Sequence, residues 1–140
     1  MGIQQLNPYL NYNGDAAKAV ELYRTALGAE VVTLSRFGDA PGASAPPETK
    51  DRVMHAVLKL GDAGTIMLSD IHPGMPHTPG TNAYVCLSFD DAAGMAQQFE
   101  ALAVGGQVTM PLEDTFWGAK FGMLMDAFGV RWMFNCEKKG

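Results

Sequence analysis

The sequence predicts an α+β fold made of two tandem βαβββ modules, whose curved mixed sheet surrounds a cup. One observation is that the order of strand-like and helix-like segments occurs twice. Another is that similar short sequences recur at nearly constant spacing: Asn7-Pro8-Tyr9 matches Asn82-Ala83-Tyr84, and Asp15-Ala16-Ala17 matches Asp91-Ala92-Ala93. Because one helix covers only one face of a sheet, the opposite faces are left to line the cup.

The first module is expected to span about residues 1–70. Alternating side chains predict a strand over 3–12, and Pro8 places it at a sheet edge. Apolar residues at helical spacing predict a helix that is capped at Asp15 and ended by Gly28. The remaining elements are a strand over 30–37, a loop over 38–50 with a mobile tip, a strand over 52–60, a turn over 61–64 and a strand over 65–69.

A proline-rich linker, about 71–80, precedes the second module, about 81–140, so that one domain of 1–140 is expected. The second module repeats the order of the first. Its expected elements are a strand over 82–89, a helix over 91–103, and strands over 107–112, 120–125 and 130–135.

Charge and composition exclude several classes of partner. Ten Lys and Arg stand against fifteen Asp and Glu, a net charge of −5 that repels nucleic acid and anionic lipid. The sequence indicates neither a signal peptide nor a membrane helix. Two cysteines without CxxC spacing, Cys86 and Cys136, favour the reducing cytoplasm over a disulfide framework.

The chain resembles the vicinal oxygen chelate superfamily, which includes glyoxalase I, extradiol dioxygenases, fosfomycin-resistance enzymes and bleomycin-binding proteins. The segments that carry the resemblance are PYLNYNG, MLSD, DTFWGAKFG and DAFGVRW. They match the PhnB-like branch, which is related to a protein encoded with bacterial phosphonate-utilisation genes. The branch is also labelled a demethylubiquinone methyltransferase, but the glycine-rich turn of a nucleotide-type cofactor site is missing here.

The resemblance also implies where a divalent metal would be held. Enzymes of the superfamily bind it in the cup through His and Glu from the first and last strand of each half. The matching positions in this sequence are Asn7, Ser69, Tyr84 and Met133. None is a His or Glu, so we expect no metal site at these positions and no cofactor.

The candidate ligand-binding residues are those that strand alternation or loop composition directs to the cup. His55 is either a ligand contact or catalytic group, or a hydrogen-bonded histidine without chemistry. Trp117 either covers a ligand or plugs one end of the cup. Met67, Met123 and Met133 offer soft, adaptable contacts or serve as core filler. The full set is Asn7, Tyr9, His55, Met67, Ser69, Tyr84, Trp117, Met123 and Met133.

The leading hypothesis is therefore a protein that binds a small organic ligand and lacks the usual catalytic metal. The resemblance further implies a homodimer. One alternative is a metal-dependent lyase, isomerase or dioxygenase with non-standard ligands, for which His55 and Asp70 are the candidates. A third hypothesis is a structural or regulatory protein whose cup is filled by its own side chains. The sequence leaves the ligand, and any catalytic residue, unidentified.

Overall fold

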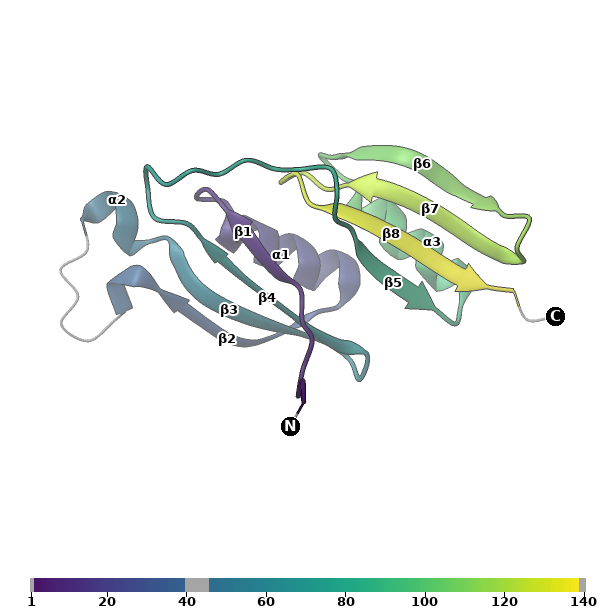
Figure 1. The fold of residues 1–140 in the computed structure, drawn as a ribbon, viewed down its shortest axis with the longest axis horizontal. Coiled ribbons are helices and arrows are strands. Elements are labelled where there is room, and N and C mark those ends of the chain that lie inside the picture. Colours follow the sequence, from purple (N-terminus) through teal and green to yellow (C-terminus); the bar gives the residue numbers. More distant parts are fainter. Residues whose placement is uncertain (1, 40–45, 139–140) are drawn as a thin grey trace. The chain divides into compact units, whose positions relative to one another are not determined.

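The computed structural model describes residues 2–39 and 46–138. The chain divides into two compact units, residues 1–78 and 79–140, here called unit 1 and unit 2. Each unit contains one open four-stranded mixed sheet and one long helix (Figure 1). The predicted α+β class and the tandem βαβββ order are confirmed.

In unit 1 the strands lie in the order β1-β4-β3-β2, and β1 pairs with β4 in parallel (Figure 1). The other pairs are antiparallel. The elements are β1 (Tyr9–Tyr12), α1 (Ala16–Leu27), β2 (Glu30–Arg36), the short 3-10 helix η1 (Phe37–Asp39), α2 (Pro47–Lys50), β3 (Val53–Leu60) and β4 (Gly64–Asp70).

The first strand is shorter than the sequence predicted. Tyr9 pairs with Met67, and one residue earlier the carbonyl of Pro8 still accepts a hydrogen bond from the Met67 amide. The partner strand β4 begins at Gly64, which the register places opposite Leu6, yet pairing in β1 begins only at Tyr9. The prediction of an edge strand is confirmed, whereas strand structure over residues 3–8 was wrong.

The region predicted as a loop over 38–50 contains helical turns. Residues 37–39 form η1, and α2 begins at Pro47, which follows Pro46. Proline suits the first helical position because its φ is already fixed and its missing N–H would have no helical partner there. The tip that we expected to be mobile, residues 40–45, lies outside the described residues.

Helix α1 forms as predicted, but its capping differs. Gly28 ends it with φ 68°, as expected for a left-handed cap. The predicted cap Asp15 makes no side-chain capping bond. Asp70 at the end of β4 supplies the carboxylate instead, accepting from the amides of Gly14 (2.8 Å) and Ala16 (3.0 Å). Tertiary structure thus provides a cap that local sequence does not show.

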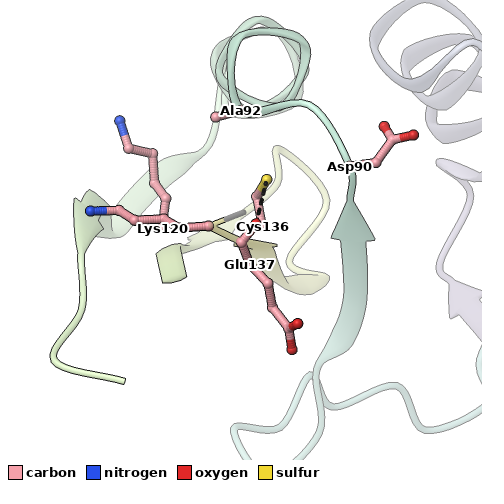
Figure 2. A pocket seen from close by; sticks show the side chains of 6 residues that line it. Asp90, Ala92, Lys120, Cys136 and Glu137 are labelled. Carbon is pink, nitrogen blue, oxygen red and sulfur yellow. Dashed lines mark hydrogen bonds between the residues drawn. The ribbon is translucent and has the colours of Figure 1, made fainter. Parts of the chain in front are cut away.

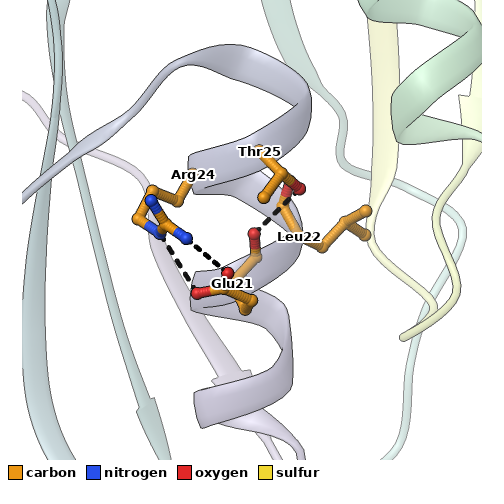
Figure 3. Close-up of polar contacts among 4 residues, drawn as sticks. All are labelled: Glu21, Leu22, Arg24 and Thr25. Carbon is orange, nitrogen blue, oxygen red and sulfur yellow. Dashed lines mark hydrogen bonds and ion pairs between the residues drawn. The ribbon is translucent and has the colours of Figure 1, made fainter.

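The solvent side of α1 carries local contacts (Figure 3). The Arg24 guanidinium bonds to the Glu21 carboxylate, which lowers the pKa of Glu21 and raises that of Arg24. The Thr25 hydroxyl donates to the carbonyls of Glu21 (3.0 Å) and Leu22 (3.1 Å). An exposed pair of this kind contributes little to stability.

The core of unit 1 lies between α1 and one face of the sheet. The Tyr12 and Tyr23 hydroxyls lie 2.7 Å apart inside it. Sheet residues of alternating parity are fully buried here: Ala56, Leu58, Ile66 and Leu68.

A register shift in β3 reverses the predicted direction of two side chains. Ser35 pairs with His55, but Arg36 pairs with Val53, so Met54 is an extra residue. Val53 is consequently fully buried and Met54 is 39% exposed, although alternation alone predicted Met54 on the buried side.

Unit 2 repeats the arrangement, with strand order β5-β8-β7-β6 and β5 parallel to β8 (Figure 1). Asp91 caps its helix, accepting from the amides of Ala93 and Gly94. The elements are β5 (Val85–Phe89), α3 (Ala92–Leu102), β6 (Gln107–Asp114), β7 (Ala119–Met125) and β8 (Arg131–Glu137). The strand predicted from Asn82 begins only at Val85, which pairs with Trp132.

The core of unit 2 is aromatic. Phe134 of β8 contacts Phe99 of α3 edge to face, with ring centroids 5.1 Å apart, and it stacks on Phe89. Trp132 and Phe134 are fully buried, as alternation predicted. The Trp132 indole donates to the buried Asp126 carboxylate at 2.9 Å.

The predicted linker is anchored at both ends. The Ile71 amide donates to the Tyr12 carbonyl, and a ring nitrogen of His77 lies 3.1 Å from the Asn11 carbonyl oxygen, both within unit 1. In unit 2 the Arg131 guanidinium donates to the Gly80 carbonyl. The boundary between the two units falls between residues 78 and 79 of the chain.

Candidate functional site

The face of the unit 1 sheet opposite α1 gathers most of the predicted residues of the first module. Tyr9 pairs with Met67, and Asn11 pairs with Ser69, on β1 and β4. We call this group the polar face of unit 1: Asn7, Tyr9, Asn11, His55, Met67 and Ser69.

Tyr9 and His55 form the most defined contact on this face. The Tyr9 hydroxyl lies 2.9 Å from Nδ1 of His55, and the rings stack at a centroid distance of 5.7 Å. Tyr9 is 44% exposed, so the pair is open to a ligand. A phenol and an imidazole held together can donate and accept hydrogen bonds and can exchange a proton.

The polar face is built from neutral groups. The Ser69 hydroxyl donates to Oδ1 of Asn11 at 3.2 Å, and Nδ2 of Asn7 donates to the Thr65 carbonyl at 3.1 Å. None of the six residues carries a carboxylate, guanidinium or ammonium group. This composition suits a ligand recognised by hydrogen bonds and ring contacts.

The corresponding face of unit 2 carries sulfur in place of amides. Cys86 pairs with Met133, Met133 with Met123, and Met123 with Met110. Residues paired across strands project from the same face. We call these four residues the sulfur row; it crosses all four strands of the sheet.

Aromatic residues lie at the connection between β6 and β7. Trp117 is 58% exposed and contacts Phe116 and Phe121, with centroids 5.0 and 6.0 Å apart. Phe121 belongs to the same face as Met123 by strand parity. Tyr84 lies just before β5 and is half-buried. The predicted residues of the second module thus belong to one unit and, apart from Tyr84, to one face or its rim.

The residues at the positions implied for a divalent metal do not fit such an ion. They offer an amide, a hydroxyl, a phenol and a thioether, at Asn7, Ser69, Tyr84 and Met133. Zinc and related ions select imidazole, thiolate and carboxylate. Over residues 2–39 and 46–138, no three His, Cys, Asp or Glu side chains come together as a metal-binding group.

The sheet of unit 1 separates the two residues considered as non-standard ligands. Asp70 shares the buried side with Leu68, and its second oxygen accepts from the Val53 amide at 2.9 Å. His55 lies on the opposite face, beside Tyr9. The Asp70 carboxylate is therefore used to join α1, β3 and β4, and it does not face His55.

A shallow depression of about 370 Å³ occurs on the other side of the unit 2 sheet (Figure 2). Lys138 pairs with Asp114 at 3.1 Å, and the Cys136 thiol donates to the Glu137 carbonyl. Acidic and basic side chains are mixed around it. Its lining consists of Asp90, Ala92, Lys120, Cys136, Glu137 and Lys138.

Two members of the sulfur row, Cys86 and Met110, were not among the candidate ligand-binding residues from the sequence. For Met110 the missing signal is the pairing of β6 with β7, which contains two irregularities, and for Cys86 it is the register between β5 and β8; neither can be read from alternation within one strand.

Comparison with known proteins identifies the family. Residues 5–134 match the model of the glyoxalase/bleomycin resistance protein/dioxygenase superfamily. Protein YjdN of Escherichia coli K12 is 30% identical, over 96% of this chain and 96% of its own length. The chain belongs to the glyoxalase/bleomycin resistance protein/dioxygenase superfamily.

The similar solved structures include a PhnB protein. Protein PA1353 from Pseudomonas aeruginosa is 42% identical, covers 98% of this chain and all of its own, and superimposes with a TM-score of 0.87. A PhnB protein from Bacillus cereus, described as a putative 3-demethylubiquinone-9 3-methyltransferase, is 25% identical over 95% of this chain and 99% of its own, with a TM-score of 0.75. Within the described part of the chain, no helix has the length and apolar character to cross a membrane.

Proposed function

We propose that this protein binds a small organic molecule and does so without a divalent metal at the positions used by metal-dependent members of its superfamily. The observation that carries the proposal is the exposed Tyr9–His55 pair, set among neutral amide and hydroxyl groups. Superfamily membership supports small-molecule binding, and the similarity to a PhnB protein supports placement in that branch.

The ligand we expect is polar, uncharged or weakly charged, and contains a flat unsaturated part. Tyr9 and His55 present ring faces and a hydrogen-bonding edge, while Asn7 and Asn11 present amides. Unit 2 separately presents Trp117 and the thioethers of Met123 and Met133, which can give adaptable apolar contacts to a ligand.

The description of the Bacillus cereus relative names methyl transfer. The connections that lead from strand to helix in this chain do not support that activity. A nucleotide-type cofactor is held at a glycine-rich turn that leads from a strand into a helix. Here the connections into α1 and α3 are Asn13-Gly14-Asp15 and Asp90-Asp91.

Equilibrium dialysis against Zn²⁺, Ni²⁺, Mn²⁺ and Fe²⁺ tests the metal part of the proposal. We expect no stoichiometric binding at micromolar concentrations by the full chain, because the donor groups do not fit. Stoichiometric binding of any of these ions would overturn it.

A small-metabolite screen by ligand-observed NMR tests the binding part. We expect hits on unit 1 whose signals weaken with His55→Ala, and hits on unit 2 whose signals weaken with Trp117→Ala. His72→Ala is a control, since His72 is an exposed histidine of the same unit that contacts Phe37 instead of Tyr9. An absence of hits, or equal effects of His55→Ala and His72→Ala, would instead favour a structural or regulatory role.

We also propose a cytoplasmic homodimer. The location is supported by two free cysteines, of which Cys86 is exposed and Cys136 buried. The dimer rests on family resemblance, and strands β2 and β6 each leave one edge unpaired. Sedimentation velocity is expected to give a species of twice the 15.0 kDa chain mass; a monomer at all working concentrations would remove this part.

A further inference from the structure

We propose that unit 2 contains a Cu(I) site formed by the thiolate of Cys86 and the thioethers of Met133 and Met123. The inference goes beyond the binding of an organic ligand and rests on a separate observation, the register of the sulfur row. It concerns a soft, monovalent ion, for which the divalent-metal positions of the family are not needed.

The sheet brings the three sulfur side chains together. Cys86 and Met133 are direct partners on the parallel strands β5 and β8, and Met133 and Met123 are direct partners on the antiparallel strands β8 and β7. The Cβ atoms of directly opposed residues in antiparallel pairs are about 4.5–5.5 Å apart, within reach of flexible methionine side chains. Met133 therefore lies between a thiol and a second thioether.

The site is open on its own face of the sheet. Phe134, the next residue along β8, is fully buried against α3, so Met133 projects away from the helix. Cys86 is exposed, and Met133 and Met123 are half-buried. An ion can reach the sulfur atoms without unfolding the core.

The chemistry of the donors selects the ion. Thiolate and thioether sulfur are soft ligands that favour Cu(I), whereas imidazole and carboxylate favour the divalent ions common in proteins. On binding, the Cys86 thiol releases its proton to solvent and the sulfur–copper bond forms, with no change in oxidation state. The thiolate charge then neutralises that of Cu(I), and the thioethers complete the coordination without adding charge.

The second cysteine provides an internal comparison. Cys136 belongs to the opposite face of β8, is only 5% exposed, and lies across from Lys120. No methionine is its direct strand partner, since Phe89 and Lys120 hold those positions. If methionine partners are needed for binding, Cu(I) should bind at Cys86 and not at Cys136.

Competition with bicinchoninate, a coloured Cu(I) chelator, tests the proposal on the reduced full chain under anaerobic conditions. We expect the protein to withdraw one equivalent of Cu(I), and Zn²⁺ at the same concentration not to displace it. Cys86→Ser should weaken binding at least about a hundredfold, and Met133→Leu and Met123→Leu about tenfold each.

The matched controls are Cys136→Ser and Met54→Leu, the latter at a methionine of unit 1 that is 39% exposed. Both should keep the wild-type affinity within about twofold. Failure of the wild type to compete would overturn the proposal. The proposal would also be overturned if Cys86→Ser weakened binding but Met133→Leu and Met123→Leu did not. In that case copper would be bound by an exposed thiol alone.

A second measurement is independent of variant folding. Cu(I) should protect Cys86 of the wild-type protein from alkylation by iodoacetamide, as followed by peptide mass spectrometry. Unchanged alkylation in the presence of stoichiometric Cu(I) would also overturn the site. Neither outcome depends on whether an organic ligand is found, so the two proposals fail separately.

Discussion

The Tyr9 hydroxyl lies 2.9 Å from Nδ1 of His55, although β4 separates the strands that carry them. The contact is a diagonal one across the sheet, and both residues were candidates from the sequence. Their pairing turns two isolated candidates into a single hydrogen-bonding unit on the polar face of unit 1.

Tyr9→Phe should allow His55 to populate both of its neutral tautomers. In the wild type we expect Nδ1 to accept from the Tyr9 hydroxyl, so that Nε2 carries the proton. The variant keeps the ring but loses the hydroxyl, and we expect mixed tautomers with a loss of no more than about 1 kcal/mol in unfolding free energy. Long-range ¹H–¹⁵N spectra report the tautomer, with His72 as the internal control. An unchanged His55 tautomer would contradict the prediction.

Asp70→Asn should destabilise unit 1, whereas Asp15→Asn should not. Asp70 is 4% exposed and accepts from three backbone amides, and an asparagine retains one acceptor oxygen. We expect a loss of about 2–3 kcal/mol in unfolding free energy. Asp15 makes no capping bond, so its variant should change stability by less than about 0.5 kcal/mol. Urea unfolding followed by circular dichroism measures both; equal losses would contradict the assignment of the cap to Asp70 alone.

Asp126→Asn should loosen the turn between β7 and β8. The carboxylate is 1% exposed and accepts from the amides of Phe128 and Val130 and from the Trp132 indole. We expect a loss of about 2–3 kcal/mol, together with a weaker near-ultraviolet signal from Trp132. Asp62→Asn, at an exposed turn of unit 1, is the control. The role assigned to Asp126 would be wrong if both variants unfolded at the same urea concentration.

Gly106→Ala should be costly because backbone atoms occupy the space of the added methyl group. A Cβ at this position would lie 2.2 Å from the Met125 carbonyl oxygen and 2.7 Å from the carbonyl carbon of Asp126. Displacement of this backbone is expected to cost about 2–3 kcal/mol. Gly64→Ala is the matched control, as no atom lies within 4 Å of its Cβ position. Thermal unfolding of the two variants should therefore separate clearly.

Much of the fold was predictable because local rules determine it. Helical spacing and Gly28 predicted α1, and alternation placed Trp132 and Phe134 in the core. Strand starts were less predictable, since pairing begins at Tyr9 in β1 and at Val85 in β5, and alternation within one strand does not show where pairing begins. The cap of α1 was not predictable at all, because Asp70 is distant in sequence.

For the candidate site, the sequence predicted on which face of the sheet most residues lie, but it did not predict which of them contact one another. The alternation of side chains along each strand placed Met67 and Met133 correctly on the face opposite the helix. The same rule failed at Met54, because β3 contains an extra residue there. The Tyr9–His55 contact and the sulfur row depend on the register between strands. That register emerges only when the sheets form, so single-strand patterns do not contain it.

Each unit pairs its first strand with its last, β1 with β4 and β5 with β8. During translation, the sheet of unit 1 therefore cannot close until β4 has left the ribosome, and β1 must wait unpaired while α1, β2 and β3 emerge. The same delay is then repeated for unit 2. Pauses in synthesis placed after β4 has emerged from the ribosome would give unit 1 time to close before the next edge strand competes for its partner.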